Sequence, residues 1–342
     1  MIRSSRELDE SDVRVRPNRR GTRPRTKKRP AHADAVPGMV LAVDRGRYTV
    51  LTDPGRRITA MRAREIGRAG VVVGDRVDVV GDVSGRAGSL ARIVRVRARA
   101  TTLRRSADDV DPTERVIVAN ADQLVIVTAL AQPEPRPRMI DRCLIAAFDA
   151  RMEPVLLLTK ADLADAETLL AAYRSLGVPA LVTAAEAGAI TGLEAVRERL
   201  RGRTSVLVGH SGVGKSTLVN ALVPAADRAT AGVNVVTGRG RHTSSSAVAL
   251  PLPGGGWVID TPGVRSFGLA HVRPAHLLAA FGDLAGAAEA CPRGCTHAGD
   301  APDCALDAWV VSASAGPAEA ARLASFRRLL ASRAGDDESD PA

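Results

Sequence analysis

The chain has 342 residues, of which 25% are charged and 45% are apolar, and its formal net charge is +10. This length predicts two or three domains, and the composition is that of an ordinary globular protein, which excludes collagen, global disorder and a bundle of membrane helices. No apolar run reaches the roughly 18–20 residues that a membrane helix needs, and the first residues, MIRSSRELDESD, carry no secretory signal. We therefore expect a cytoplasmic protein without a membrane contact.

Positive charge is concentrated in the first third of the chain. Residues 1–105 carry 26 Lys and Arg against 11 Asp and Glu, a net charge of +15, whereas residues 106–342 carry a net charge of −5. This imbalance predicts an extended polyanion as partner, although a solvated surface in an arginine-rich protein would look the same. Residues 1–35 are predicted to form a disordered basic tail, because positions 13–30 hold nine basic residues, three Pro and no acid.

Residues 36–105 are predicted to form five short strands separated by Gly, Asp and Pro, which favours a small barrel of the OB-fold type. The five stretches are GMVLAVD, RYTVL, RITAMRA, DRVDVVGD and SLARIVRVR. Tyr48 is the only aromatic residue in this segment, so an RNA contact would depend on arginine–phosphate contacts more than on base stacking. A barrel that binds no ligand is the alternative.

Residues 106–272 alternate between apolar strands and helical stretches, which predicts an α/β domain with helices on both faces of a parallel sheet. The strands are QLVIVTAL, EPVLLLTK, PALVTA, SVLVGH and GGWVID, and the helices are RPRMIDRCLIAAF, DLADAETLLAAYRSLG, GLEAVRERL and GKSTLVNALV. Cys143, in the first helix, is expected to be a buried small residue. Residues 273–335 are predicted to be helical around a cysteine cluster, and residues 336–342 form an acidic tail.

The strand SVLVGH runs into GHSGVGKST, which matches the phosphate-binding pattern G-x-x-x-x-G-K-[ST]. Glycines let backbone N–H groups turn inward around a phosphate, and the following helix adds its positive end. Lys215, one of only four Lys in the chain, would bridge the outer phosphates, and the Ser216 hydroxyl would bind Mg²⁺. The predicted phosphate-binding residues are Gly209, His210, Ser211, Gly212, Val213, Gly214, Lys215, Ser216 and Thr217.

The tetrapeptide TKAD, residues 159–162, ends a predicted strand and is a candidate for binding guanine. The Asp162 carboxylate can accept hydrogen bonds from the N1–H and the exocyclic amine of guanine, a donor pair that adenine does not offer, and the Lys160 stem can cover the ring. An ordinary turn after a strand could have the same four residues, so this motif alone does not exclude an ATP-using enzyme. TAAEAG, from Thr183, ends the next strand and would add a backbone N–H to the guanine oxygen.

Two segments follow the phosphate loop, GRGRHTSSS and DTPG. Each alone could be a plain loop, but together, in this order after the phosphate loop, they predict two switch segments that sense the third phosphate. Asp260 would hold Mg²⁺ through water and Thr243 would complete its ligands, while the Gly263 N–H would contact the third phosphate.

A nucleotide bound at this loop is expected to be hydrolysed only slowly by the isolated protein. Val264 stands where many GTPases have a Gln that orients water, and a valine side chain cannot do so. His242 is the nearest residue able to orient or deprotonate water and is the candidate catalytic residue. A structural or RNA-contacting histidine is the alternative.

Near the C-terminus, Cys291-x₃-Cys295-x-His297-x₆-Cys304 supplies three thiols and one imidazole. This set is typical of a structural, tetrahedral Zn²⁺ site without an open position, and we expect one zinc per chain. A set of free thiols is the alternative.

The order of these motifs carries a family resemblance: TKAD, then TA, the phosphate loop, GRHTS and DTPG, between a β barrel and a Cys/His cluster. Ordinary GTPases place the phosphate loop first. Over about residues 36–330 the chain resembles the circularly permuted, ribosome-dependent RsgA/YjeQ GTPases. The resemblance implies an α/β P-loop GTPase domain, circularly permuted, with an N-terminal OB-fold barrel and a C-terminal helical zinc domain.

The resemblance also implies a function. It is that of a GTPase that binds the small (30S) ribosomal subunit and its rRNA, is stimulated by it, and hydrolyses GTP during late subunit maturation, with Mg²⁺ bound alongside GTP. Thr159, Lys160 and Asp162 would hold the base, although the family usually has Asn where this chain has Thr159. We expect a monomer; a non-catalytic RNA-binding scaffold and an ATP-using enzyme are the competing interpretations.

Overall fold

The computed structural model describes residues 32–53, 55–66, 70–106, 114–186, 188–224, 247–261, 267, 269, 271–312 and 317–334. The predicted acidic tail lies outside these residues, as does the predicted basic tail except for its last four positions. The chain divides into two compact units, Met1–Ala33 and Asp34–Ala342, and the elements described below belong to the second. Within the described part of the chain, no helix is long and apolar enough to cross a membrane.

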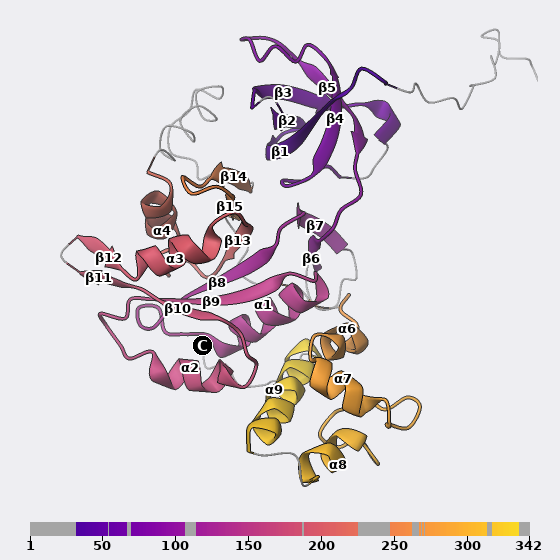
Figure 1. Cartoon of the computed structure of the whole chain (residues 1–342), viewed down its shortest axis with the longest axis vertical. Helices are drawn as coiled ribbons and strands as arrows, with labels where there is room; N and C mark the ends of the chain where they lie inside the picture. The colour runs from indigo at the N-terminus through magenta and orange to yellow at the C-terminus, as the bar shows by residue number, and fades with distance from the viewer. Residues whose placement is uncertain are drawn as a thin grey trace, which may run out of the picture. The chain divides into compact units, whose positions relative to one another are not determined.

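The predicted five-stranded barrel is present (Figure 1). Its strands are β1 (Val36–Asp44), β2 (Arg47–Thr52), β3 (Arg57–Arg62), β4 (Arg76–Gly81) and β5 (Ala91–Val96). They pair in the order β1-β2-β3-β5-β4, and β4 returns to β1, which closes the barrel. Along β3 exposed and buried residues alternate, so that Ile58 and Ala60 point into the barrel core.

Two carboxylates of the barrel neutralise part of its arginine-rich strand β5 and the residues after it. Asp78, almost fully buried, accepts hydrogen bonds from Arg95 at 3.1 Å and from Arg97 at 2.6 and 2.9 Å. Asp75 binds Arg99 through both carboxylate oxygens, at 2.7 and 2.8 Å. A buried carboxylate is stable only when it is paired, so these three arginines have a structural task within the barrel.

The predicted α/β domain is built on a parallel sheet. Its parallel strands are β8 (Gln123–Ala129), β9 (Glu153–Thr159), β10 (Ala180–Val182), β13 (Thr204–Val208) and β15 (Trp257–Asp260), in the order β10-β9-β8-β13-β15. A further strand, β14 (Val248–Pro251), runs antiparallel to β15 and also meets β1 at Ala42. The motifs did not predict β14, nor the hairpins β6 (Thr102–Ser106)–β7 (Glu114–Ala119) and β11 (Ala184–Glu186)–β12 (Ala189–Thr191).

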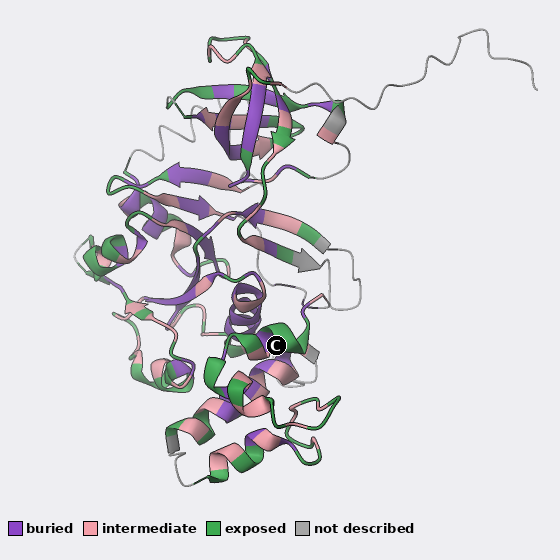
Figure 2. Ribbon diagram, turned by 45° about the vertical axis from the view of Figure 1, so that its right-hand side comes forward, coloured by how far each residue is buried: buried purple, intermediate pink, exposed green. Residues whose placement is uncertain are grey.

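Helices cover both faces of this sheet, as the apolar strands predict (Figure 2). In β8, Leu124 and Ile126 pack with α1 (Pro137–Asp149). The alternating residues Val125 and Val127 pack with α3 (Leu193–Leu200) and α4 (Lys215–Leu222). Cys143 on α1 is buried as expected, and burial raises the pKa of its thiol to about 12.

The other α-helices in the described part of the chain follow the sheet strands β9 and β15 in sequence. They are α2 (Glu167–Arg174), α6 (Pro274–Ala279), α7 (Gly282–Ala288), α8 (Ala305–Val311) and α9 (Pro317–Ala334). Phe281 contacts the rings of both Phe148 and Phe326 edge-to-face, with ring centroids 5.5 Å apart in each pair. One apolar core thus continues from α1 into the C-terminal helices. The domain limits at residues 105/106 and 272/273 stay predictions from the sequence.

Candidate functional site

The phosphate loop lies between the carboxyl end of β13 and the first turn of α4, as its motif predicts. Gly209 has φ +153°, and a Cβ there would lie 2.2 Å from the Val127 carbonyl oxygen, so no larger residue fits. Gly214 has φ +92° and is the residue before α4. The loop therefore needs glycine at both positions, and its bend leads directly into the N-terminus of α4.

Lys215 is held against the loop from which it extends. Its Nζ donates to the carbonyl oxygens of Gly209, at 2.5 Å, and His210, at 2.9 Å. In this motif the backbone N–H groups of the loop surround a phosphate, and the Lys215 ammonium lies at the same loop. The two hydrogen bonds therefore hold a positive charge at the phosphate-binding position.

Asp260 lies at the end of β15, next to β13 in the sheet. Burial raises the pKa of its carboxyl, and the positive charge of Lys215 opposes that rise, so the two groups are electrostatic neighbours. The Thr261 hydroxyl donates to the Leu207 carbonyl at 2.8 Å and ties this strand end to β13. Asp260 lies beside Lys215, and the exposed Ser216 follows Lys215 in the chain; their role as Mg²⁺ ligands stays a prediction.

The predicted guanine-binding residues lie at the same edge of the sheet, because β9 is separated from β13 only by β8. The Thr159 hydroxyl, nearly buried, donates to the Val213 carbonyl at 2.7 Å, which joins the end of β9 to the phosphate loop. Lys160 has φ +60°, and its Nζ donates to the Gln132 carbonyl after β8. The motifs did not point to Gln132; its position two residues after a predicted parallel strand was the available signal.

The loop that holds Asp162 and the segment that begins at Thr183 are in contact. One carboxylate oxygen of the exposed Asp162 accepts a hydrogen bond from the Ala185 N–H at 3.0 Å. The Ala161 N–H donates to the Thr183 carbonyl at 3.1 Å. The two motifs thus form one loop pair beside the phosphate loop.

Three predicted site residues lie outside the described residues. They are His242, the candidate catalytic residue, and Thr243 and Gly263, the candidate magnesium and phosphate contacts. Their assignments stay predictions from the sequence.

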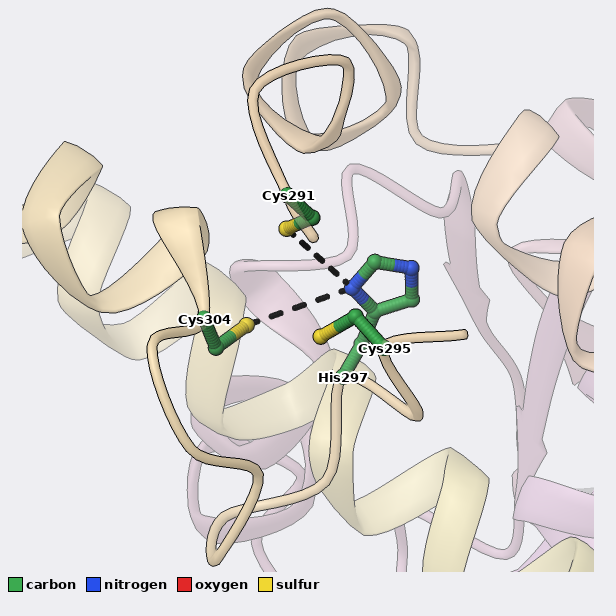
Figure 3. Close-up of side chains that lie close together, drawn as sticks. All are labelled: Cys291, Cys295, His297 and Cys304. Carbon is green, nitrogen blue, oxygen red and sulfur yellow. Dashed lines mark hydrogen bonds between the residues drawn. The ribbon is translucent and has the colours of Figure 1, made fainter. Parts of the chain in front are cut away.

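The predicted metal ligands Cys291, Cys295, His297 and Cys304 come together between α7 and α8 (Figure 3). Their four ligand atoms lie within 4.8 Å of one another, and His297 Nδ1 is 3.6 Å from Cys291 Sγ and 3.9 Å from Cys304 Sγ. A tetrahedral zinc with bonds of about 2.3 Å to sulfur and about 2.0 Å to nitrogen places its ligands about 3.5–3.8 Å apart. Both the donor set and its spacing therefore fit one structural Zn²⁺.

The surroundings of the cluster also suit a metal. The Ala305 N–H donates to Cys291 Sγ at 3.3 Å, which is the kind of contact that stabilises a bound thiolate. Arg327 donates to the His297 carbonyl at 3.2 Å and binds both carboxylate oxygens of Asp307, at 2.7 and 2.9 Å. The histidine backbone is thereby oriented by α9.

Comparisons with known proteins agree with this arrangement. The family model for the RsgA GTPase matches residues 96–270. The Small ribosomal subunit biogenesis GTPase RsgA of Ectopseudomonas mendocina (strain ymp) is 44% identical over 228 residues, which are 65% of this chain and 64% of that relative. The protein of the same name from Pseudomonas fluorescens (strain SBW25) is 41% identical over 266 residues, 74% of each chain. The first alignment thus spans just under two thirds of the relative.

Two solved structures share the fold. The crystal structure of YjeQ from Thermotoga maritima has a TM-score of 0.64 and 27% identity, and the match covers 88% of this chain and 99% of that chain. YloQ, a circularly permuted GTPase, has a TM-score of 0.62 at 20% identity, over 92% of this chain and all of the other. The motif order, the barrel and the Cys/His cluster have the same explanation: this chain belongs to the RsgA GTPase family, with the circularly permuted GTPase fold.

Proposed function

We propose that this chain is a GTPase that binds the small (30S) ribosomal subunit and hydrolyses GTP to GDP and phosphate during late maturation of that subunit. The names of its relatives, small ribosomal subunit biogenesis GTPases, support this role. The observation that carries the proposal is the hydrogen bond from Thr159 to the Val213 carbonyl, because it joins the base-binding loop and the phosphate loop in one site.

In this site, Asp162 binds the guanine edge and the Lys160 stem covers the ring. Lys215 and the backbone N–H groups of the phosphate loop neutralise the phosphates. Ser216 and Asp260 would hold Mg²⁺, which when bound would neutralise part of the phosphate charge. The half-buried Asp260 carboxylate, whose pKa is raised by burial against the opposing effect of the nearby Lys215 charge, is a group that a cation would stabilise, which agrees with this assignment.

The barrel and the basic N-terminal residues provide the contact to rRNA. Arg95, Arg97 and Arg99 are engaged by the barrel's own carboxylates, so phosphate binding falls to the other arginines of this region. The zinc centre serves as a structural support for the C-terminal helices. The protein acts as a monomer in the cytoplasm.

The test is a phosphate-release assay with purified protein, with and without small ribosomal subunits, and with GTP or ATP as substrate. We expect slow GTP hydrolysis alone, a strong increase with subunits, and no hydrolysis of ATP. Subunit binding without phosphate release would instead support the non-catalytic scaffold, and hydrolysis of ATP would support an ATP-using enzyme.

A further inference from the structure

The last helix, α9, contacts the helix that follows the guanine-binding loop. α2 begins five residues after Asp162, and its C-terminal turn faces α9. Arg322 donates to the Ser175 carbonyl at 2.9 Å, and Arg328 donates to the Ala172 carbonyl at 3.4 Å. The last carbonyl groups of a helix have no partner within the helix and carry partial negative charge, so two guanidinium groups are a favourable cap for α2.

Arg328 also binds α1 and an aromatic ring of α2. Its Nε donates to the nearly buried carboxylate of Asp141 on α1 at 3.1 Å. The guanidinium lies 5.1 Å from the ring centre of Tyr173, which is buried. The neighbouring Ser325 meets Ser175 with a hydroxyl–hydroxyl distance of 2.8 Å. One arginine therefore joins α9 to both helices that flank the guanine-binding loop.

These contacts continue to the guanine-binding loop itself. The Tyr173 hydroxyl donates to the carbonyl of Pro137, the first residue of α1. Five residues earlier, the Gln132 carbonyl accepts the hydrogen bond from Lys160. Residues 132–137 are therefore bonded at one end to Lys160 and at the other to Tyr173. A displacement of Tyr173 or α1 would move the Gln132 carbonyl that binds Lys160.

A different face of α9 contacts the metal cluster. Arg327, the residue before Arg328, binds Asp307 and the His297 carbonyl. Consecutive residues of one helix point about 100° apart, so α9 contacts two different structures through adjacent side chains. The cluster and the guanine-binding loop share this helix as a common support.

We propose that Arg328 is a positioning residue for guanine nucleotide binding: through α9 it holds α2 and α1 in the arrangement that places Lys160 and Asp162 at the base. This inference rests on the proposed function. It assigns part of the guanine affinity to a helix that touches no nucleotide, and it makes the C-terminal helices a place from which a bound partner can change that affinity.

The experiment measures the affinity of the full-length protein for GDP, and for tripolyphosphate by displacement of labelled GDP. In R328A we expect GDP affinity to fall about five- to tenfold, within the usual range of coupling between sites, and tripolyphosphate affinity to stay within about twofold. R328K, which keeps the charge opposite Asp141 but cannot form the planar contacts, should give a smaller loss of GDP affinity. If R328A does not fold, R328K carries the test.

The matched control is R333A, on the same helix. It should change GDP affinity by less than about twofold, because the Arg333 guanidinium donates to the Val272 carbonyl and not to α1 or α2. An equal loss in R333A, an equal loss of tripolyphosphate affinity in R328A, or unchanged GDP affinity in the Arg328 variants would overturn the proposal. A wild-type protein that binds no GDP would overturn the proposed function as well, whereas the first three outcomes leave that function intact.

Discussion

The phosphate loop and the zinc loop, residues 289–304, are both irregular segments suited to a ligand, yet their surroundings differ. The phosphate loop is anchored in the core by Val208 and Val213, both buried, and by hydrogen bonds from Lys215 and Thr159. All residues of the zinc loop are described, and among them only Cys304 is buried. Apolar burial therefore shapes the first loop without a ligand, whereas the second needs its metal to be ordered.

The largest effect should come from removing the metal. In Cys304→Ser we expect bound zinc to fall from one per chain to near zero, because structural zinc contributes on the order of 10 kcal/mol through its complete ligand set. Metal analysis measures the loss, and hydrogen exchange should show faster exchange of amides across the zinc loop. Cys143→Ala is the matched control, since Cys143 lies on α1 away from the cluster, and it should keep its zinc. Full zinc content in Cys304→Ser would contradict the assignment.

Next in size is Lys215→Ala. We expect the Lys215 ammonium to exchange its present hydrogen bonds for charge-assisted hydrogen bonds to the phosphates when GTP binds. Each such bond contributes about 1.5–3 kcal/mol, so GTP affinity should fall about 30- to 100-fold in the variant. Nucleotide titration measures the change, and metal analysis should find the zinc content unaltered. A simultaneous loss of zinc would break the contrast between a preformed loop and a metal-dependent one.

Asp162→Asn should change the preferred base. The amide can no longer accept both hydrogen bonds from guanine, so we expect a loss of about 2 kcal/mol, or about 30-fold, in GTP affinity. Xanthosine triphosphate, which carries a carbonyl oxygen in place of the amine, should bind the variant more tightly than GTP. Competition between the two nucleotides measures this. Unchanged preference would show that Asp162 does not contact the base.

The smallest effect concerns Thr159. Thr159→Val keeps the side-chain shape but leaves the Val213 carbonyl without its donor, which costs about 1 kcal/mol and lowers GTP affinity about fivefold. Thr159→Ser keeps the donor and should retain most of the affinity, as measured by the same titration. Equal losses in both variants would show that the methyl group, and not the hydrogen bond, is what the loop requires.

Sequence patterns predicted the elements whose signals are local. The five barrel strands, the parallel sheet and the grouping of Cys291, Cys295, His297 and Cys304 are confirmed, because alternation, glycine spacing and ligand spacing are properties of short segments. The strand β14 was missed because VALP is too short to show a period.

Long-range partners could not be predicted in the same way. Nothing in the residues around Thr159 shows that its hydroxyl binds the Val213 carbonyl, 54 positions later. The pairing of Asp141 with Arg328 spans 187 positions, and the chain has 44 arginines from which to choose. Such contacts follow from the packing of whole helices, which a local pattern does not contain.

The contact of α9 with α2 has a consequence for synthesis of the protein. TKAD and α2 leave the translating ribosome early, but Ser325 and Arg328, which complete the end of α2, are made more than 140 residues later. At a rate of about 5–20 residues per second, α9 is synthesised roughly 7–30 seconds after the guanine-binding loop and α2. A chain released before residue 317 lacks that support altogether, so incomplete translation products should be poor competitors for guanine nucleotides.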